Sequence, residues 1–202
     1  LSDRTGGLPV ALTNDANAAA VGEMTYGAAR GMKNFIMITL GTGVGSGIVI
    51  NGEVVYGHDG FAGELGHTCA VRSNGRLCNC GKHGCLETYT SATGVARTAR
   101  EWLEMSDEPS SLRSLDSISS KDVFTGKMLG RSFADFVAFS APEAIVLFGG
   151  LARAKEYLYQ PMFASMNENL LPLWRDKIKI VFSQLKESDA AILGASALAW
   201  EL

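Results

Sequence analysis

The chain has 202 residues, of which 47% are hydrophobic and 19% charged, and its formal net charge at pH 7 is -3. This hydrophobic fraction is enough for one sizeable core or two small ones, which excludes a disordered chain. Lysine and arginine are scattered rather than clustered, so we expect this segment to bind no nucleic acid. Apolar runs such as Phe35–Leu40 and Ala144–Phe148 are far shorter than the ~20 residues that cross a bilayer, so we expect no membrane span.

The first elements predicted are a strand, a helix and a β-meander. The apolar stretch 9–13 favours a short strand, and Asn14 and Asp15 after it are good N-cap residues for the alanine-rich helix that follows. The stretches 34–40 and 44–50 read as two strands joined by a tight GTG turn, and NGEVV opens a third strand. Since the opening LSDRTGGLPVALT has no initiator methionine and no signal-peptide pattern, we expect part of a longer cytoplasmic polypeptide.

The second half of the chain alternates helical and strand patterns, which is typical of an α/β fold. The expected elements are a helix up to about Met105, a serine-rich surface connection over 106–120, a helix over 128–139, a buried parallel strand over 143–150, a helix over 155–170, a strand over 178–182 and a last helix over 191–202. No internal repeat is found.

A cysteine-rich loop, GELGHTCAVRSNGRLCNCGKHGCLETY, lies between these halves. Three thiolates and one imidazole complete a tetrahedral zinc shell, and glycines let the backbone fold tightly around an ion. A disulfide framework is disfavoured because no secretory context is present and two of the cysteines are only two positions apart. The sequence therefore predicts a zinc site whose ligands are His67, Cys78, Cys80 and Cys85.

Four protein ligands leave no open coordination position, so we expect this zinc to be structural rather than catalytic. Cys69 and His83 are alternative candidates for the fourth ligand, but we expect Cys69 to be a packed thiol and His83 to face solvent.

Two further signals are ambiguous by themselves. The stretch LGTGVGSGIVING allows backbone N–H groups to approach an anion, but its glycines also suit an ordinary hairpin. Asp15 is either a helix N-cap or a carboxylate that accepts a proton from a substrate hydroxyl.

The order of the motifs resolves these alternatives. TNDANAAAVGE, LGTGVGSGIVING, GELGH, CNCGKHGCLE and IVLFGG together resemble the sugar kinases of the ROK family (repressors, open reading frames and kinases), from about Leu8 to the C-terminus. The CxCGxxGCxE pattern after GxxGH is the most specific part, and SATGVARTARE looks most like bacterial glucokinases. The resemblance implies an α/β fold: residues 1–202 as the C-terminal lobe of an actin-like, ribonuclease-H-like ATPase, with a β-meander, flanking helices and a zinc loop over 63–87.

The resemblance also implies an activity: phosphorylation of a hexose, with glucose favoured, at its 6-hydroxyl by ATP and Mg²⁺, in glycolysis and carbohydrate metabolism. Asp15 matches the general base that accepts the hydroxyl proton. The residues that match sugar-binding positions of the family are Asn14, Glu64, His67 and Glu87. The residues that match its nucleotide-binding turns are Gly41, Thr42, Gly43, Gly149 and Gly150. His67 then has two tasks, with one ring nitrogen on zinc and the other facing the sugar.

The chain departs from the family pattern in two places. Nothing matches the DxGxxT strand with which family kinases begin, so we expect the N-terminal lobe to be absent and the chain alone to be inactive as a kinase. The last helix, 190–202, is expected to point toward that lobe. The family also carries a longer helical stretch between Phe124 and Thr125, so we expect residues to be missing there.

Family members commonly pair through this lobe, so we also expect a homodimer. A competing interpretation is the sugar-sensing body of a ROK transcriptional regulator, which needs no phosphotransfer. The intact NDAN and GTGVG stretches favour the kinase, because a sensor has no need of a phosphate-binding turn. A zinc-stapled structural domain without a ligand is the third interpretation, and it leaves the ordered motifs unexplained.

Overall fold

The computed structural model describes residues 2–107, 113, 126–186 and 189–200. Within them a five-stranded sheet with strand order β3-β2-β1-β4-β5 is flanked by helices. The strands are β1 Phe35–Leu40, β2 Val44–Ile50, β3 Glu53–Val54, β4 Ala144–Phe148 and β5 Lys179–Phe182. The helices are α1 Asp15–Tyr26, α2 Glu87–Thr90, α3 Ala92–Met105, α4 Gly126–Ser140, α5 Lys155–Asn169 and α6 Ala190–Ala199, with short 3₁₀ helices at Ser2–Thr5, Leu65–His67 and Gly150–Ala154.

The sheet is mixed. Strands β1, β2 and β3 form the predicted antiparallel meander, with Leu40 opposite Val44 where the first turn closes. Strand β4 pairs parallel with β1, and β5 pairs parallel with β4. The parallel strands are connected through helices, as parallel pairing requires. The carboxyl ends of β1 and β4 therefore lie side by side at one edge, where a ligand site is common in open α/β sheets.

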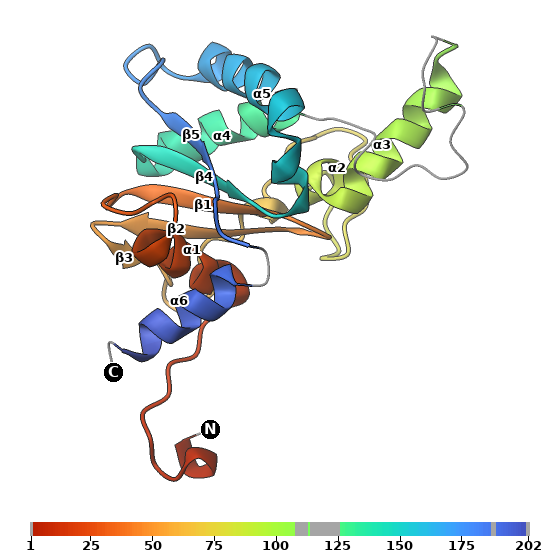
Figure 1. Cartoon of the computed structure of the whole chain (residues 1–202). Helices are drawn as coiled ribbons and strands as arrows, with labels where there is room; N and C mark the ends of the chain where they lie inside the picture. The colour runs from red at the N-terminus through yellow and green to blue at the C-terminus, as the bar shows by residue number, and fades with distance from the viewer. Residues whose placement is uncertain (1, 108–112, 114–125, 187–188, 201–202) are drawn as a thin grey trace.

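Alternating side chains of β1 build a core on each face of the sheet, as the period of two dictates. Ile36, Ile38 and Leu40 pack with residues of α4 and α5. Phe35 and Met37 pack with alanines of α1 and α6 on the opposite face. Figure 1 shows the resulting three layers, with α4 and α5 on one side of the sheet and α1 and α6 on the other. The predicted α/β fold with a meander and flanking helices is confirmed.

Helix α1 is buried almost all round over its first two turns because it lies between β2 and α6. Its small residues allow this close approach. A Cβ atom at Gly22 would lie 2.4 Å from the carbonyl oxygen of Ala190, and one at Gly194 would lie 1.6 Å from that of Ala18. The two helices are therefore in backbone-to-backbone contact, which fixes the position of α1 and of the residues at its N-terminus.

The start of the chain does not form the strand expected from the sequence. The strand predicted over 9–13 is wrong: the stretch is exposed and pairs with no strand among the described residues, and Pro9 has no N–H to contribute to a ladder. The serine-rich connection falls almost entirely outside the described residues, as do Phe124 and Thr125. The helical spacing of the apolar residues in α3 predicts Trp102 on the packed face of that helix, but Trp102 is 39% exposed.

Among the described helices, not one combines the length and the apolar character that crossing a bilayer requires.

We predict that Gly194→Ala lowers the free energy of unfolding by about 1–3 kcal/mol, because the added methyl group forces α6 away from α1. Chemical denaturation monitored by circular dichroism measures the change. Ser196→Ala, at an exposed position of the same helix, is the matched control and should change the stability by less than about 0.5 kcal/mol. Equal effects of the two substitutions would show that the close contact contributes nothing.

Candidate functional site

A cavity of about 570 Å³ opens where the carboxyl ends of β1 and β4 meet the N-terminus of α1. Its volume suits a small-molecule ligand. Ten residues singled out in the sequence line it: Asn14, Asp15, Gly41, Thr42, Gly43, Glu64, His67, Glu87, Gly149 and Gly150. They come from five separate segments of the chain, so the fold brings the predicted catalytic, sugar-facing and nucleotide-facing groups into one site.

Asp15 is the first residue of α1, and Asn14 before it caps the helix. The Oδ1 atom of Asn14 accepts a hydrogen bond of 2.7 Å from the backbone N–H of Asn17. The Asp15 residue is exposed, and within the described part of the chain its carboxylate accepts only the N–H of Ala16, at 2.9 Å. Because Asn14 satisfies the helix end, Asp15 is not needed as a cap, and its second carboxylate oxygen can accept a substrate proton.

The two glycine turns lie side by side at the cavity, because each follows one of the adjacent parallel strands β1 and β4. In the GTG turn (Gly41, Thr42, Gly43) the N–H of Gly41 donates to the carbonyl oxygen of Gly43 at 3.0 Å. Gly149 has a φ of 101°, and a Cβ atom there would lie 2.6 Å from the carbonyl oxygen of Leu40. Glycine is therefore required where β4 passes the end of β1.

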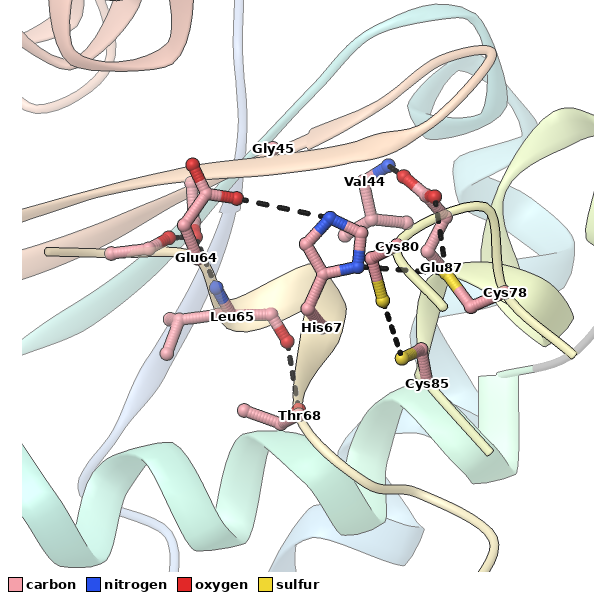
Figure 2. A network of polar contacts seen from close by, with 12 residues as sticks. Val44, Gly45, Glu64, Leu65, His67, Thr68, Cys78, Cys80, Cys85 and Glu87 are labelled. Atoms are coloured by element: carbon pink, nitrogen blue, oxygen red, sulfur yellow. Dashed lines mark hydrogen bonds and ion pairs between the residues drawn. The ribbon is translucent and has the colours of Figure 1, made fainter. Parts of the chain in front are cut away.

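The four predicted zinc ligands converge. The ligand atoms of His67, Cys78, Cys80 and Cys85 all lie within 4.8 Å of one another. Nδ1 of His67 is 3.6 Å from Sγ of Cys78, and Sγ of Cys80 is 3.6 Å from Sγ of Cys85 (Figure 2). A tetrahedral site with Zn–S bonds of about 2.3 Å has edges of about 3.8 Å, so the donor set and its spacing fit zinc. All four cysteines of the chain are free thiols in the structure, which agrees with a metal site rather than a disulfide framework.

His67 faces two ways, as the sequence led us to expect. Its Nδ1 points at the cysteines, whereas its Nε2 lies 4.0 Å from Oε2 of Glu64 on the cavity wall (Figure 2). A metal ion on Nδ1 would place the proton on Nε2, which makes that nitrogen a hydrogen-bond donor toward the cavity.

The cysteine-rich loop folds through two isolated antiparallel bridges, between Cys69 and Cys85 and between Leu77 and His83. The N–H groups of Ala70 and Val71 donate to the carbonyl oxygen of Gly84 at 2.8 and 3.1 Å. Cys69 is exposed, so the expectation of a packed thiol is wrong: the bridge turns its side chain outward, away from the four ligands. His83 faces solvent as predicted, with Nδ1 3.0 Å from the carbonyl oxygen of Gly75.

The thiols of the cluster are not equivalent in acidity. The backbone hydrogen bond with Lys82 lowers the pKa of Cys80, whereas burial raises the pKa of Cys85 to about 12. Metal binding would therefore have to displace protons from buried thiols, which couples metal affinity to pH.

Sequence reasoning missed two residues that hold the site together. The buried Arg76 donates to the carbonyl oxygens of Thr88 and Gly94 and pairs with Glu101 at 2.6 Å, so it ties the cysteine-rich loop to α3. The buried Ser46 donates from Oγ to the carbonyl oxygen of Gly63 and accepts from the N–H of Leu65 at 3.2 Å. The one sequence signal for Ser46 is that it is a polar residue at a strand position expected to be buried, where its hydroxyl group needs hydrogen-bond partners.

We predict about one zinc ion per chain in purified protein by elemental analysis, and a marked loss of it in Cys80→Ser, which removes one of four ligands. Cys69→Ser is the matched control and should keep the zinc, because Cys69 lies outside the cluster. A zinc content that is the same in both variants would contradict the ligand set.

We also predict a pH-dependent contribution of Glu101. Arg76, followed by Arg97, lowers the pKa of Glu101 below its ordinary value of 4.5, so its stabilisation is complete above pH 4.5 and disappears as the pH falls through the lowered pKa. The Glu101 side chain is 42% exposed and solvent screens its ion pairs, so Glu101→Gln should lower the free energy of unfolding at pH 7 by only about 0.5 kcal/mol, and by less in acid. Urea denaturation at both pH values measures this. Glu104→Gln on the same helix removes a carboxylate that forms no ion pair among the described residues, and at pH 7 it should change the stability less than Glu101→Gln does.

Comparison with known proteins gives three relevant similarities. A glucokinase of Halalkalibacterium halodurans is 40% identical over 210 residues, which cover 95% of this chain and 63% of that protein. The crystal structure of a ROK family glucokinase from Streptomyces griseus in complex with glucose and AMPPNP matches with a TM-score of 0.83 and 32% identity, over 100% of this chain and 71% of that chain. A ROK family transcriptional regulator, homologous to Escherichia coli MLC, matches with a TM-score of 0.84 and 30% identity, over 98% of this chain and 53% of that chain.

The chain spans less than two thirds of the length of the Halalkalibacterium glucokinase. The model of the ROK family matches residues 1–201, nearly the whole chain. The chain belongs to the ROK family.

Proposed function

We propose that the full-length protein transfers the γ-phosphoryl group of ATP to the 6-hydroxyl of a hexose, with glucose favoured and Asp15 as the general base. The observation that carries the proposal is the cavity of about 570 Å³, which is lined together by Asp15, the polar residues Glu64, His67 and Glu87, and both glycine turns. The glucokinase similarities, one of them a structure with glucose and AMPPNP, support the same reaction class.

The polar wall suits a sugar. Glu64, His67 and Glu87 line the cavity and offer carboxylate acceptors together with an imidazole donor, and the amide nitrogen of Asn14 stays available because only its oxygen caps α1. Hydroxyl groups can donate to the carboxylates and accept from the amide and the imidazole. The wall thereby orients the 6-hydroxyl toward Asp15 at the helix N-terminus.

The glycine turns suit phosphate groups. The backbone at Gly41, Gly43 and Gly150 carries no side chain that would keep an anion away. ATP would bring Mg²⁺, which neutralises charge on the phosphoryl oxygens. Because the transition state of phosphoryl transfer is loose, the chain contributes mainly positioning, and Asp15 accepts the hydroxyl proton as the new O–P bond forms.

A second candidate is a sugar-sensing regulator, which the similarity to the MLC homologue supports. A sensor requires the polar wall but neither Asp15 nor a phosphate-binding turn. The presence of both in the cavity favours the kinase.

We predict that the full-length protein forms ADP in a coupled assay with at least one of glucose, mannose, fructose and N-acetylglucosamine. Asp15→Asn should lower kcat about 100-fold or more with a small change in hexose KM, because it removes the base and leaves the sugar wall intact. Asp176→Asn makes the same change at a remote turn with a φ of 59°, which asparagine also accepts, and should be neutral.

Normal turnover of Asp15→Asn would show that the base assignment is wrong. Hexose binding without any turnover in the wild type would instead support the regulator.

A further inference from the structure

The GTG turn is held by the segment that follows the last cysteine ligand. The N–H of Ala92 donates to the carbonyl oxygen of Gly41 at 2.8 Å, and the N–H of Val44 donates to Oε2 of Glu87 at 2.9 Å. Thr93 adds a longer contact from Oγ1 to the carbonyl oxygen of Thr42 at 3.5 Å. The turn is therefore braced from outside its own hairpin, at both ends.

Glu87 lies between the cysteine cluster and the GTG turn. It is the first residue of α2, two positions after Cys85, and its side chain is partly buried. While Oε2 accepts from Val44, Oε1 lies 3.9 Å from Sγ of Cys78 (Figure 2). One carboxylate thus contacts both a predicted metal ligand and the backbone of the turn.

Gly43 shows how closely this carboxylate packs on the turn. A Cβ atom at Gly43 would lie 2.5 Å from Oε2 of Glu87, a distance that real Cβ contacts do not show. Gly43 has no positive φ that would require glycine on conformational grounds. A larger residue at this position would therefore require the Glu87 carboxylate to move away from the turn.

We propose that Glu87 is a positioning residue for the GTG turn, through which the cysteine-rich loop sets the geometry of nucleotide binding as well as that of the sugar wall. The inference rests on the proposed function, in which this turn binds phosphate groups. It does not exclude a sugar contact, because an ionised carboxylate has about four acceptor positions and the hydrogen bond to Val44 uses one. The coupling runs from the loop through Glu87 to the N–H of Val44.

Two substitutions separate the hydrogen bond from the charge. Glu87→Gln and Glu87→Ala both remove the negative charge near the phosphate groups, but only alanine removes the oxygen that accepts from Val44 and leaves that buried N–H without its partner. Glu64→Ala is the control at the sugar wall, since Glu64 has no hydrogen bond to the GTG turn among the described residues.

Calorimetric titration of the full-length protein with a non-hydrolysable ATP analogue and Mg²⁺, without sugar, is the first test. We expect Glu87→Ala to bind the analogue about tenfold more weakly than Glu87→Gln. Glu64→Ala should keep the nucleotide affinity of the wild type while its hexose affinity falls. Equal nucleotide affinities of the alanine and glutamine variants of Glu87 would overturn the inference.

Hydrogen exchange separates failure of this inference from failure of the proposed function. In Glu87→Ala, the amide of Val44 should exchange faster than in Glu87→Gln, whether or not the protein binds nucleotide. Unchanged exchange would overturn the positioning role. A wild type that binds no nucleotide, with exchange at Val44 still accelerated in Glu87→Ala, would refute the kinase while leaving the bracing of the turn established.

Discussion

Convergence of His67, Cys78, Cys80 and Cys85 is the constraint on which the polar wall of the cavity and, through Glu87, the GTG turn depend. An imidazole and three thiols gain little from one another at distances of 3.6–4.8 Å, and burial raises the pKa of Cys85 to about 12. A cation shared by the four groups would supply the missing attraction by holding the thiolates in one shell. The loop that carries these residues also carries Glu64 and Glu87, so in our proposal a metal ion there would also fix the positions of the two carboxylates on the cavity wall (Figure 2).

The opposite side of the cavity is fixed by packing rather than by a metal. Contact between α1 and α6 through Gly22 and Gly194 places Asn14 and Asp15 at a defined distance from the strand ends. Packed helices therefore hold the Asp15 carboxylate, while the cysteine-rich loop carries Glu64, His67 and Glu87 on the cavity wall. Under the proposed function, a stable scaffold presents the base and a loop presents the groups that contact the sugar.

Much of the fold followed from the sequence because its signals are local. The strand-like stretches 34–40 and 44–50, with the GTG turn between them, predicted the meander, and the N-cap residues Asn14 and Asp15 predicted the start of α1. The prediction of a strand over 9–13 was wrong because a strand needs a neighbouring strand to pair with, and the local sequence pattern does not show whether one is present. The hydrogen bond between Val44 and Glu87 spans 43 positions, and the contacts of Ser46 span 17 and 19, so they depend on topology that no local motif encodes. The spacing of the cysteines and His67 predicted the four clustered residues correctly. The exposure of Cys69 could not be predicted in this way, because it depends on the bridge that Cys69 forms with Cys85.

The most direct test of this account is to remove the metal from the full-length protein with a chelator and restore it with zinc, measuring hexose and nucleotide affinity separately in each state. If the cysteine-rich loop positions both the sugar wall and the GTG turn, the hexose and nucleotide affinities both fall when the metal is removed. Both affinities then recover with about one equivalent of zinc. If both affinities stay unchanged while the zinc is demonstrably gone, the cluster does not control the site and the account is wrong.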